Sequence, residues 1–296
     1  MPTQKKSRTS KPPVTEIGVI GGSGIYQIEG MANVREYRIK TPFGKTSDAI
    51  IIGELKGVRV AFLPRHGRGH YINPTNLPQR ANIWALKSLG VKTLIAVSAV
   101  GSLKEELAPR HFVFPSQLVD NTKGRDYTFF TDGAVAHAKF SHPFCADLSD
   151  ILYKTAKKIG LTAHKGGILV CMEGPAFSTK AESDYHRKMG YDLIGMTTSP
   201  EAKLAREASM CYAPISLVTD YDSWKEDEEV HGEMVIQTVA SNSANAKKLI
   251  ATAIPEIAAR IKKCGCNTAM KGALFTDPKI IPAKTKKNLA IILKDM

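Results

Sequence analysis

The sequence predicts an α/β protein, a single domain with a mixed, largely parallel twisted sheet flanked by helices. Two observations support this prediction. Short apolar runs rich in β-branched residues alternate with stretches of helical periodicity between residues 14 and 262. Several of these runs also end in small polar or charged residues, which is typical of parallel strands whose carboxyl ends face a binding site.

Composition narrows the class of protein. The 296 residues are 43% apolar, which is enough for a sizeable core, and the net charge is +13. The basic residues crowd at the two ends while the middle mixes both signs, so a nucleic-acid-binding face is disfavoured. Because no apolar run has membrane-spanning length and no signal peptide is visible, we expect a cytoplasmic protein without a membrane partner.

Three segments are expected. Residues 1–13 are polar, basic and proline-containing, which predicts a disordered tail. Residues 14–262 carry the alternating pattern and form the domain. Residues 263–296 are expected to pack as a C-terminal extension on the domain or on a neighbouring subunit.

The first predicted strand, Ile17–Ile20, runs directly into the turn Gly21-Gly-Ser-Gly24. Such a turn can direct backbone N–H groups at an anion, and the hydroxyl of Ser23 adds a donor. The dinucleotide-binding fingerprint is incomplete, because Gln27 stands where its third glycine belongs. The turn therefore predicts an anion site without naming the anion.

Strands are next predicted at Ala49–Ile52 and Val58–Leu63, and the second ends in the cationic cluster Pro64-Arg-His-Gly-Arg-Gly-His70. A metal site is not favoured, because the glycines oppose a helix and no carboxylate accompanies the histidines. Arg65 suits phosphate, since a guanidinium donates two parallel hydrogen bonds. A plain surface loop is the alternative.

The alternation continues through the middle of the chain. Further strands are predicted at Thr93–Val97, Phe112–Phe114, Leu118–Asp120, Ile168–Met172 and Asp192–Met196. Helices are predicted from the cap at Asn73–Asn76 to about Leu89, over Leu148–Ile159, after the capping box of Thr179 and Glu182, and from Pro200 to about Cys211. Residues 121–146 form a long polar connection, a length typical of functional or mobile loops.

The last predicted strand, Pro214–Thr219, is followed by Asp220 and Asp222. Taken alone, two acids after a strand indicate a solvated turn or a helix cap. A long helix over Gly232–Ala253 follows, and Pro255 is expected to separate it from a shorter one.

The five polar strand ends together predict a chemistry. They carry Ser23, Arg65 with His66, Ser98, Thr197, and the two acids. If they converge, one side of the pocket is cationic and rich in hydroxyls, and the other side is acidic. The first side suits phosphate and the second suits the N–H donors of a nitrogen heterocycle.

The five cysteines are Cys145, Cys171, Cys211, Cys264 and Cys266. Their spacing contains no paired CxxC motif, so no metal site is predicted and buried free thiols are the simplest interpretation. Cys264 and Cys266 are separated by one glycine, so a redox-active pair of these two thiols stays open as an alternative.

At this point the motifs resemble the trimeric nucleoside phosphorylase family, over essentially all of residues 14–262, and within it the branch that acts on S-methyl-5'-thioadenosine. The matching stretches are Ile20-Gly-Gly-Ser-Gly24, Thr41-Pro-Phe-Gly-Lys45, Arg65-His-Gly67, Ala81-Asn-Ile-Trp-Ala-Leu86, Glu173-Gly-Pro-Ala-Phe-Ser178, Met196-Thr-Thr-Ser-Pro-Glu201 and Thr219-Asp-Tyr-Asp-Ser-Trp224. Seven motifs in the same order make a chance match very improbable.

The resemblance implies a nucleoside phosphorylase-like fold and phosphorolysis, with inorganic phosphate as co-substrate and no cofactor. It implies that phosphate is held by Ser23, Arg65, His66 and Thr197, helped by the backbone around Ser98 and Ala99. It implies that Met196 packs on the ribose, that Phe177 lines the base site, that Asp220 supplies a proton at the purine N7, and that Asp222 holds the exocyclic amine. Members that act on 6-oxopurines place Asn at these acids.

The resemblance also bears on assembly. It implies a homotrimer, with a homohexamer as a further possibility, in which His137 reaches the 5' pocket of a neighbouring subunit. Leu289–Leu293 is expected to pack on the core or to reach a neighbour. In archaeal-type members the matching cysteines, Cys145, Cys211 and the pair at 264 and 266, form disulfides.

Two rival functions stay open. The first is a purine nucleoside phosphorylase that prefers adenosine or inosine with an intact 5'-hydroxyl. The second is a noncatalytic nucleotide-binding module.

Overall fold

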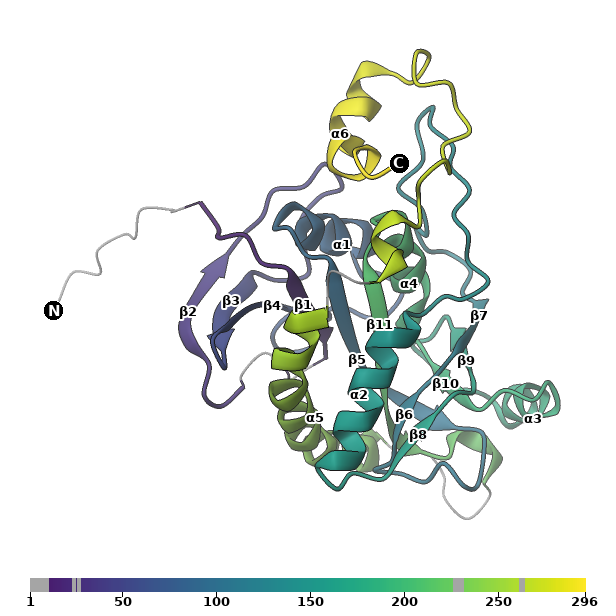
Figure 1. The fold of residues 1–296 in the computed structure, drawn as a ribbon. Helices are drawn as coiled ribbons and strands as arrows, with labels where there is room; N and C mark the ends of the chain where they lie inside the picture. Colours follow the sequence, from purple (N-terminus) through teal and green to yellow (C-terminus); the bar gives the residue numbers. More distant parts are fainter. Residues whose placement is uncertain (1–10, 23–24, 26–27, 226–231, 261–263) are drawn as a thin grey trace, which may run out of the picture.

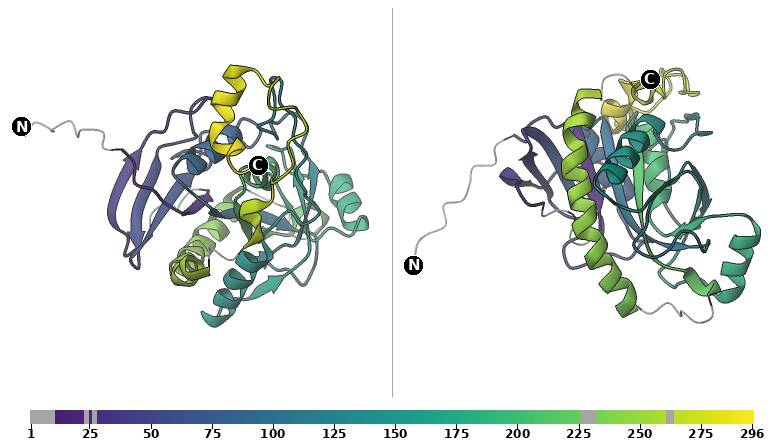
Figure 2. Two further views of the ribbon diagram at one scale, coloured as in Figure 1. Left: turned by 45° about the horizontal axis from the view of Figure 1, so that its top comes forward. Right: turned by 60° about the horizontal axis from the view of Figure 1, so that its bottom comes forward.

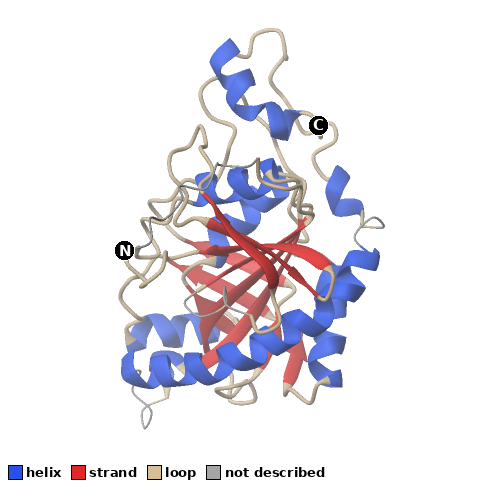
Figure 3. Ribbon diagram, turned by 90° about the vertical axis from the view of Figure 1, so that its left-hand side faces the viewer, coloured by secondary structure: helices blue, strands red, loops and turns tan. Residues whose placement is uncertain are grey.

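The computed structural model describes residues 11–22, 25, 28–225, 232–260 and 264–296. An eleven-stranded sheet forms its centre, and helices cover both faces of this sheet (Figures 1 and 3). The predicted class is therefore confirmed: the protein is a single α/β domain with a mixed sheet. The basic tail falls largely outside the described residues, as does Ser23.

Parallel strands make up the middle of the sheet. They are β1 (Ile17–Gly21), β4 (Val58–Pro64), β5 (Thr93–Ser102) and β11 (Cys211–Asp220). β1 pairs with β4 on one side and β5 on the other, and β11 pairs along almost the whole of β5. All four strands end at the same edge, so the side chains that follow them meet there.

Antiparallel pairs extend the sheet outwards. β3 (Ile50–Leu55) pairs with β4, and β2 (Ala32–Tyr37) pairs with β3. β10 (Leu193–Gly195) runs antiparallel to the end of β5 and is followed outwards by β9 (Ile168–Met172) and β7 (Gln117–Asn121). β6 (Phe112–Phe114) pairs with β11, and β8 (Ala163–Lys165) pairs with β6.

Two helical layers bury the sheet. α2 (Ala146–Lys158) and α5 (Gly232–Arg260) pack side by side on one face (Figure 2). α1 (Gln79–Ser88) and α4 (Thr198–Glu207) pack together on the other face, and α6 (Ala283–Leu293) packs on α1. α3 (Lys180–Lys188) begins at the predicted capping box of Thr179 and Glu182. No helix among the described residues is long and apolar enough to span a bilayer.

Several predicted boundaries are wrong. α1 begins at Gln79, because the Asn73 side chain accepts from the Asn76 N–H in a separate turn and Pro78 precedes the helix. α4 ends at Glu207, since Cys211 already starts β11.

The predicted break at Pro255 does not occur, and α5 continues through it. Ile254 and Ile257 are both buried in the core, and this packing holds the helix together on either side of the proline. β2 and β8 were not predicted: β2 is polar and almost wholly exposed, and β8 has only three residues.

The C-terminal segment returns to the domain beside the long connection of residues 121–146 (Figure 1). Ala136 forms an antiparallel bridge with Leu274, and the indole of Trp84 donates to the carbonyl of Asn288. Leu289 and Ile292 are buried. Of the two expectations for Leu289–Leu293, packing on the chain's own core is therefore observed.

Candidate active site

The candidate site lies at the carboxyl ends of the parallel strands. β5 is buried along its length except at Ala99, which follows Ser98 and is exposed. An exposed residue inside a central strand shows that the sheet opens to solvent at this point. The predicted phosphate-binding and acidic residues surround it.

Two hydroxyls meet beside this opening. The Oγ of Ser98 lies 2.9 Å from the Oγ1 of Thr197, and both residues are buried. Thr197 is the N-cap of α4, but its side chain makes no capping hydrogen bond. Its hydroxyl is thus directed across to β5, and the extended backbone of Ser199, with a ψ of 137°, separates it from the regular part of α4.

Arg65 follows β4 and is only 1% exposed. Its Nε and Nη2 donate to the two carboxylate oxygens of Glu201 at 2.8 and 2.9 Å, and its Nη1 donates to the carbonyl of Val97. The hydroxyl of Tyr212 also donates to Glu201. Arg65 is therefore locked beside Ser98 by a buried, paired network, and most of its donors are already used within the protein.

His66 is neutral in this environment. Burial, together with the charge of Arg65, lowers the pKa of His66 to about 4. Its Nδ1 lies 2.8 Å from the carbonyl of Ile72, so Nδ1 carries the proton and donates, while the ring stacks on His70. Nε2 is then an acceptor, suited to an oxygen that still carries a hydrogen.

The two acids at the end of β11 differ in their contacts. Asp220 accepts from the Thr219 hydroxyl at 2.7 Å and from the Asp222 N–H at 2.9 Å, so each of its carboxylate oxygens has a partner. Asp222 is 4% exposed and its Oδ2 has no hydrogen-bond partner. A buried acceptor is costly to leave unpaired, so Asp222 is the acid of this pair whose oxygen is available to accept a hydrogen bond from a ligand.

Burial, with a smaller contribution from the charge of Asp222, raises the pKa of Asp220 above its ordinary value. Gly101 makes room for this pair: a Cβ there would lie 2.9 Å from Asp220 Oδ1 and 3.0 Å from Ile194. The acids are therefore pressed against β5 and β10, and a solvated turn is excluded as an interpretation of them.

The residues implied for the sugar and base lie on the segments after β9 and β10. Met196 packs over Gly174, whose φ of +68° and lack of a Cβ permit the contact. Phe177 is 48% exposed. Ser223, next to Asp222, donates to the carbonyl of Ser178, which ties this segment to the acid pair.

Arg125 is a functional candidate that the sequence did not reveal. It lies in the long connection, and its guanidinium donates to the backbone carbonyls of Met196, Ser199, Met172 and Glu173 and to the Glu173 carboxylate. One buried cation thus fixes the two segments that carry Met196 and Phe177. An arginine in a polar loop gives no signal of this role, because its partners are main-chain atoms distant in sequence.

His137 is not brought to the acids of its own chain by any described contact. It is exposed, its N–H donates to Ala273, and its ring packs edge-on against Phe275 at 4.5 Å. It therefore belongs to a surface formed by the long connection and the C-terminal segment.

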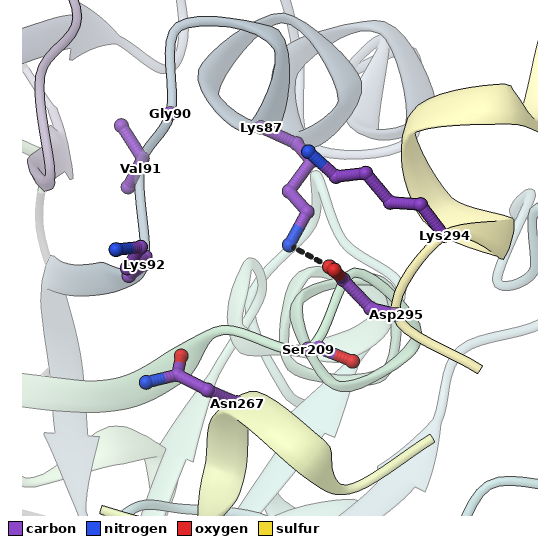
Figure 4. Close-up of a pocket in the computed structure, with 8 residues that line it drawn as sticks. All are labelled: Lys87, Gly90, Val91, Lys92, Ser209, Asn267, Lys294 and Asp295. Carbon is purple, nitrogen blue, oxygen red and sulfur yellow. Dashed lines mark ion pairs between the residues drawn. The ribbon is translucent and has the colours of Figure 1, made fainter. Parts of the chain in front are cut away.

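A surface hollow at the opposite edge of the sheet is a poor candidate site. It is lined by residues that precede β5 and β11 and by the C-terminus, and Lys87 pairs there with Asp295 at 2.6 Å (Figure 4). It lies at the amino ends of the central strands, whereas Arg65 follows β4, Ser98 lies in the second half of β5 and Asp220 ends β11.

The comparisons with known proteins agree with this geometry. The family model described as the Phosphorylase superfamily matches residues 16–255. The S-methyl-5'-thioadenosine phosphorylase of Geobacter sulfurreducens is 51% identical over 279 residues, covering 94% of this chain and 97% of that protein. The protein of the same name from Hyperthermus butylicus is 50% identical over 90% of this chain and 98% of its own length.

Solved structures are similar as well. A methylthioadenosine phosphorylase from an Antarctic soil metagenomic library superposes with a TM-score of 0.91 at 47% identity, covering 95% of this chain and 99% of that one. An adenosine/methylthioadenosine phosphorylase variant from Schistosoma mansoni, in complex with adenine, gives a TM-score of 0.79 at 34% identity, with 95% and 98% covered.

Proposed function

This chain belongs to the phosphorylase superfamily, and we propose that it phosphorolyses S-methyl-5'-thioadenosine to adenine and 5-methylthioribose 1-phosphate. The observation that carries the substrate class is the acid pair. Asp220 has a raised pKa, and the buried Oδ2 of Asp222 lacks a donor. An adenine ring meets both acids, because its exocyclic amine can donate a hydrogen bond to Asp222 and its N7 can accept a proton from Asp220.

The phosphate side supports the second substrate. Ser98 and Thr197 provide two buried hydroxyls that lie together, and Arg65, paired with Glu201, holds the end of β4 beside them. Neutral His66 suits the one protonated oxygen of a phosphate dianion, because its Nε2 accepts. The backbone at Ala99 is exposed to the same space. Ser23 is proposed to complete the site on the strength of its motif alone.

These two sides match the charges of the reaction. As the glycosidic bond breaks, the sugar becomes positive and the purine negative. A phosphate dianion on one side of the anomeric carbon stabilises the sugar and then forms the new C–O bond. The burial that raises the pKa of Asp220 favours its protonated form, and we propose that Asp220 gives a proton to N7, so the base leaves neutral, while Asp222 holds the amine.

We propose that Met196 packs on the ribose and that Phe177 lines the base site. Arg125 acts as a positioning residue for both segments, because it holds four carbonyls of their backbone. Phosphate is a co-substrate, and the reaction as proposed uses no cofactor.

The proposed assembly is a homotrimer, or two such trimers paired into a hexamer, in which His137 contributes to the 5' pocket of a neighbouring subunit. Its exposure, away from its own chain's acids, supports a role in a neighbour's site. Val135 and Phe275 are also exposed beside it and add apolar surface to that face.

The test is release of adenine from methylthioadenosine by the purified full chain, with and without inorganic phosphate. We expect adenine and a sugar 1-phosphate in equal amounts, and no turnover without phosphate. Adenine release that does not depend on phosphate would mean hydrolysis and would refute the proposal. Lack of turnover on every purine nucleoside would favour a binding module.

A second candidate activity is phosphorolysis of adenosine. The Schistosoma mansoni relative carries both substrates in its name, and its fold covers 95% of this chain. Comparing kcat/KM for methylthioadenosine, adenosine and inosine separates the two functions. Adenosine differs from methylthioadenosine only in its 5' substituent, and inosine differs from adenosine only at the 6-position.

A further inference from the structure

Four of the five cysteines gather at one place outside the proposed active site. Cys145 precedes α2, Cys211 begins β11, and Cys264 and Cys266 follow α5. Their four sulfur atoms all lie within 4.8 Å of one another, and the Sγ atoms of Cys145 and Cys264 are 3.3 Å apart. Spacing in the sequence does not show this cluster, because three separate elements build it.

The main chain holds two of these cysteines firmly. The N–H of Cys145 donates to the carbonyl of Tyr212, and the N–H of Cys211 donates to the carbonyl of Lys92. Both residues are buried. The Sγ of Cys264 accepts from the N–H of Cys266, so a local hydrogen bond also orients the thiol of Cys264.

We propose that these four cysteines form a structural zinc site. Zinc bound by four thiolates is tetrahedral, with Zn–S bonds of about 2.3 Å and hence sulfur–sulfur separations of about 3.8 Å. Such an ion requires every sulfur to be near the other three, which is the arrangement observed. Two disulfides would require only two close pairs, each with sulfurs about 2.0 Å apart.

The N-terminus of α2 is the feature of the surroundings that favours a negative complex. Four thiols that bind Zn²⁺ release up to four protons to the solvent, and the resulting complex carries a charge of −2. Cys145 stands at the N-terminus of α2, where a negative charge is stabilised. The hollow beside the cluster is lined by the basic residues Lys154 and Arg260 and by the acidic residues Asp147, Asp150 and Glu256, so its side chains add no net positive charge.

The position of the cluster argues for a structural role. Cys211 begins β11 and pairs with Thr93 at the start of β5, so the cluster lies at the amino ends of the strands, opposite to Asp220 and Ser98. The zinc joins the segment after α5 to α2 and β11. It thereby fixes the start of the C-terminal extension to the domain.

The experiment measures metal in the full chain, expressed with zinc, purified with reductant and desalted. We expect about one zinc per chain by mass spectrometry of the metal content. The C264S and C266S variants should fall to less than a tenth of this value. C171S is the matched control and should keep its zinc, because Cys171 lies in β9 and bonds to Ser199 instead.

Cobalt gives a second measurement that does not depend on the variants folding. The wild-type chain loaded with Co²⁺ should show the sulfur-to-cobalt charge-transfer and visible bands of a tetrahedral thiolate complex, and equimolar Zn²⁺ should abolish them. Metal-free protein with five free thiols would overturn the proposal. So would a second preparation, purified without reductant, in which denaturation exposes only one thiol, since that result means two disulfides.

Discussion

At the scale of single residues, Asp220 and Asp222 share one environment but have different partners. Both carboxylate oxygens of Asp220 accept from the chain itself, which fixes its orientation. Oδ2 of Asp222 has no donor, so this acid can accept a hydrogen bond from a ligand. The sequence places both acids at the same strand end and does not distinguish them.

The first prediction concerns Asp220→Asn. An amide has no acidic proton for N7, so kcat for methylthioadenosine should fall by about 10²- to 10⁴-fold, the usual contribution of a general acid. Its N–H group can donate to a 6-carbonyl, so some activity on inosine should appear. Steady-state kinetics on both nucleosides measure this. Full activity of the variant on methylthioadenosine would show that Asp220 is not the acid.

At the scale of elements, the long connection matters because it ties distant segments together. Arg125 fixes the backbone after β9 and β10, while Thr128 and Phe129 bond to the carboxylate of Glu207 on α4. The connection is therefore part of the site's framework and not a plain surface loop.

The second prediction concerns Arg125→Ala. The loss leaves buried carbonyls without donors, so the free energy of unfolding should fall by about 3 kcal/mol. KM should rise for both nucleoside and phosphate, because the clamp holds the carbonyls of Met196 and Ser199 on either side of Thr197 as well as the backbone before Phe177. Urea unfolding and two-substrate kinetics provide the readouts. The exposed Arg35→Ala is the control, and equal changes in both variants would contradict the clamp.

The third prediction concerns pH and Glu207. Burial raises the pKa of Glu207 from its usual 4.5 to about 7, so the folded state binds this proton more tightly than the unfolded state. The contribution of this group to stability is full below pH 4.5 and is lost as pH rises through about 7, by up to roughly 3 kcal/mol.

Glu207→Gln cannot titrate, so this part of the pH dependence should disappear from urea unfolding curves measured between pH 5 and pH 8. Asp48 offers a control, because the hydrogen bonds from Arg68 hold its pKa at about 2 and it does not titrate in that range. Identical slopes of stability against pH in wild type and Glu207→Gln would refute the assignment.

At the scale of the whole molecule, the chain leaves a surface around His137 whose role depends on assembly. Phe275 is 71% exposed there, and both residues lie on segments that the bridge between Ala136 and Leu274 holds together. A subunit interface would bury this surface and bring His137 to a neighbouring site.

The fourth prediction tests this with two impaired variants, Asp220→Asn and His137→Ala. If each site takes Asp220 from one subunit and His137 from its neighbour, random mixing in equal amounts gives about a quarter of the sites both native residues. Activity should then rise above that of either variant after co-refolding. Sedimentation confirms assembly, and activity no greater than the average of the two variants would place both residues in one subunit's site.

The sequence determined much of the fold because its signals are local. Apolar runs and the capping box of Thr179 and Glu182 predicted most elements, and the polar strand ends predicted that Ser98 and Thr197 would lie close together. It failed at β2, where an exposed edge strand has no apolar pattern, and at Pro255, where core packing outweighs the lost hydrogen bond.

What only the tertiary structure decided are the contacts between residues distant in sequence. The pairing of Arg65 with Glu201, the Arg125 clamp and the gathering of Cys145, Cys211, Cys264 and Cys266 depend on how strands and helices pack. No local pattern encodes them, because each is a distance in space between segments. The sequence by itself determined which groups this protein has for its chemistry, and packing determined which of them meet.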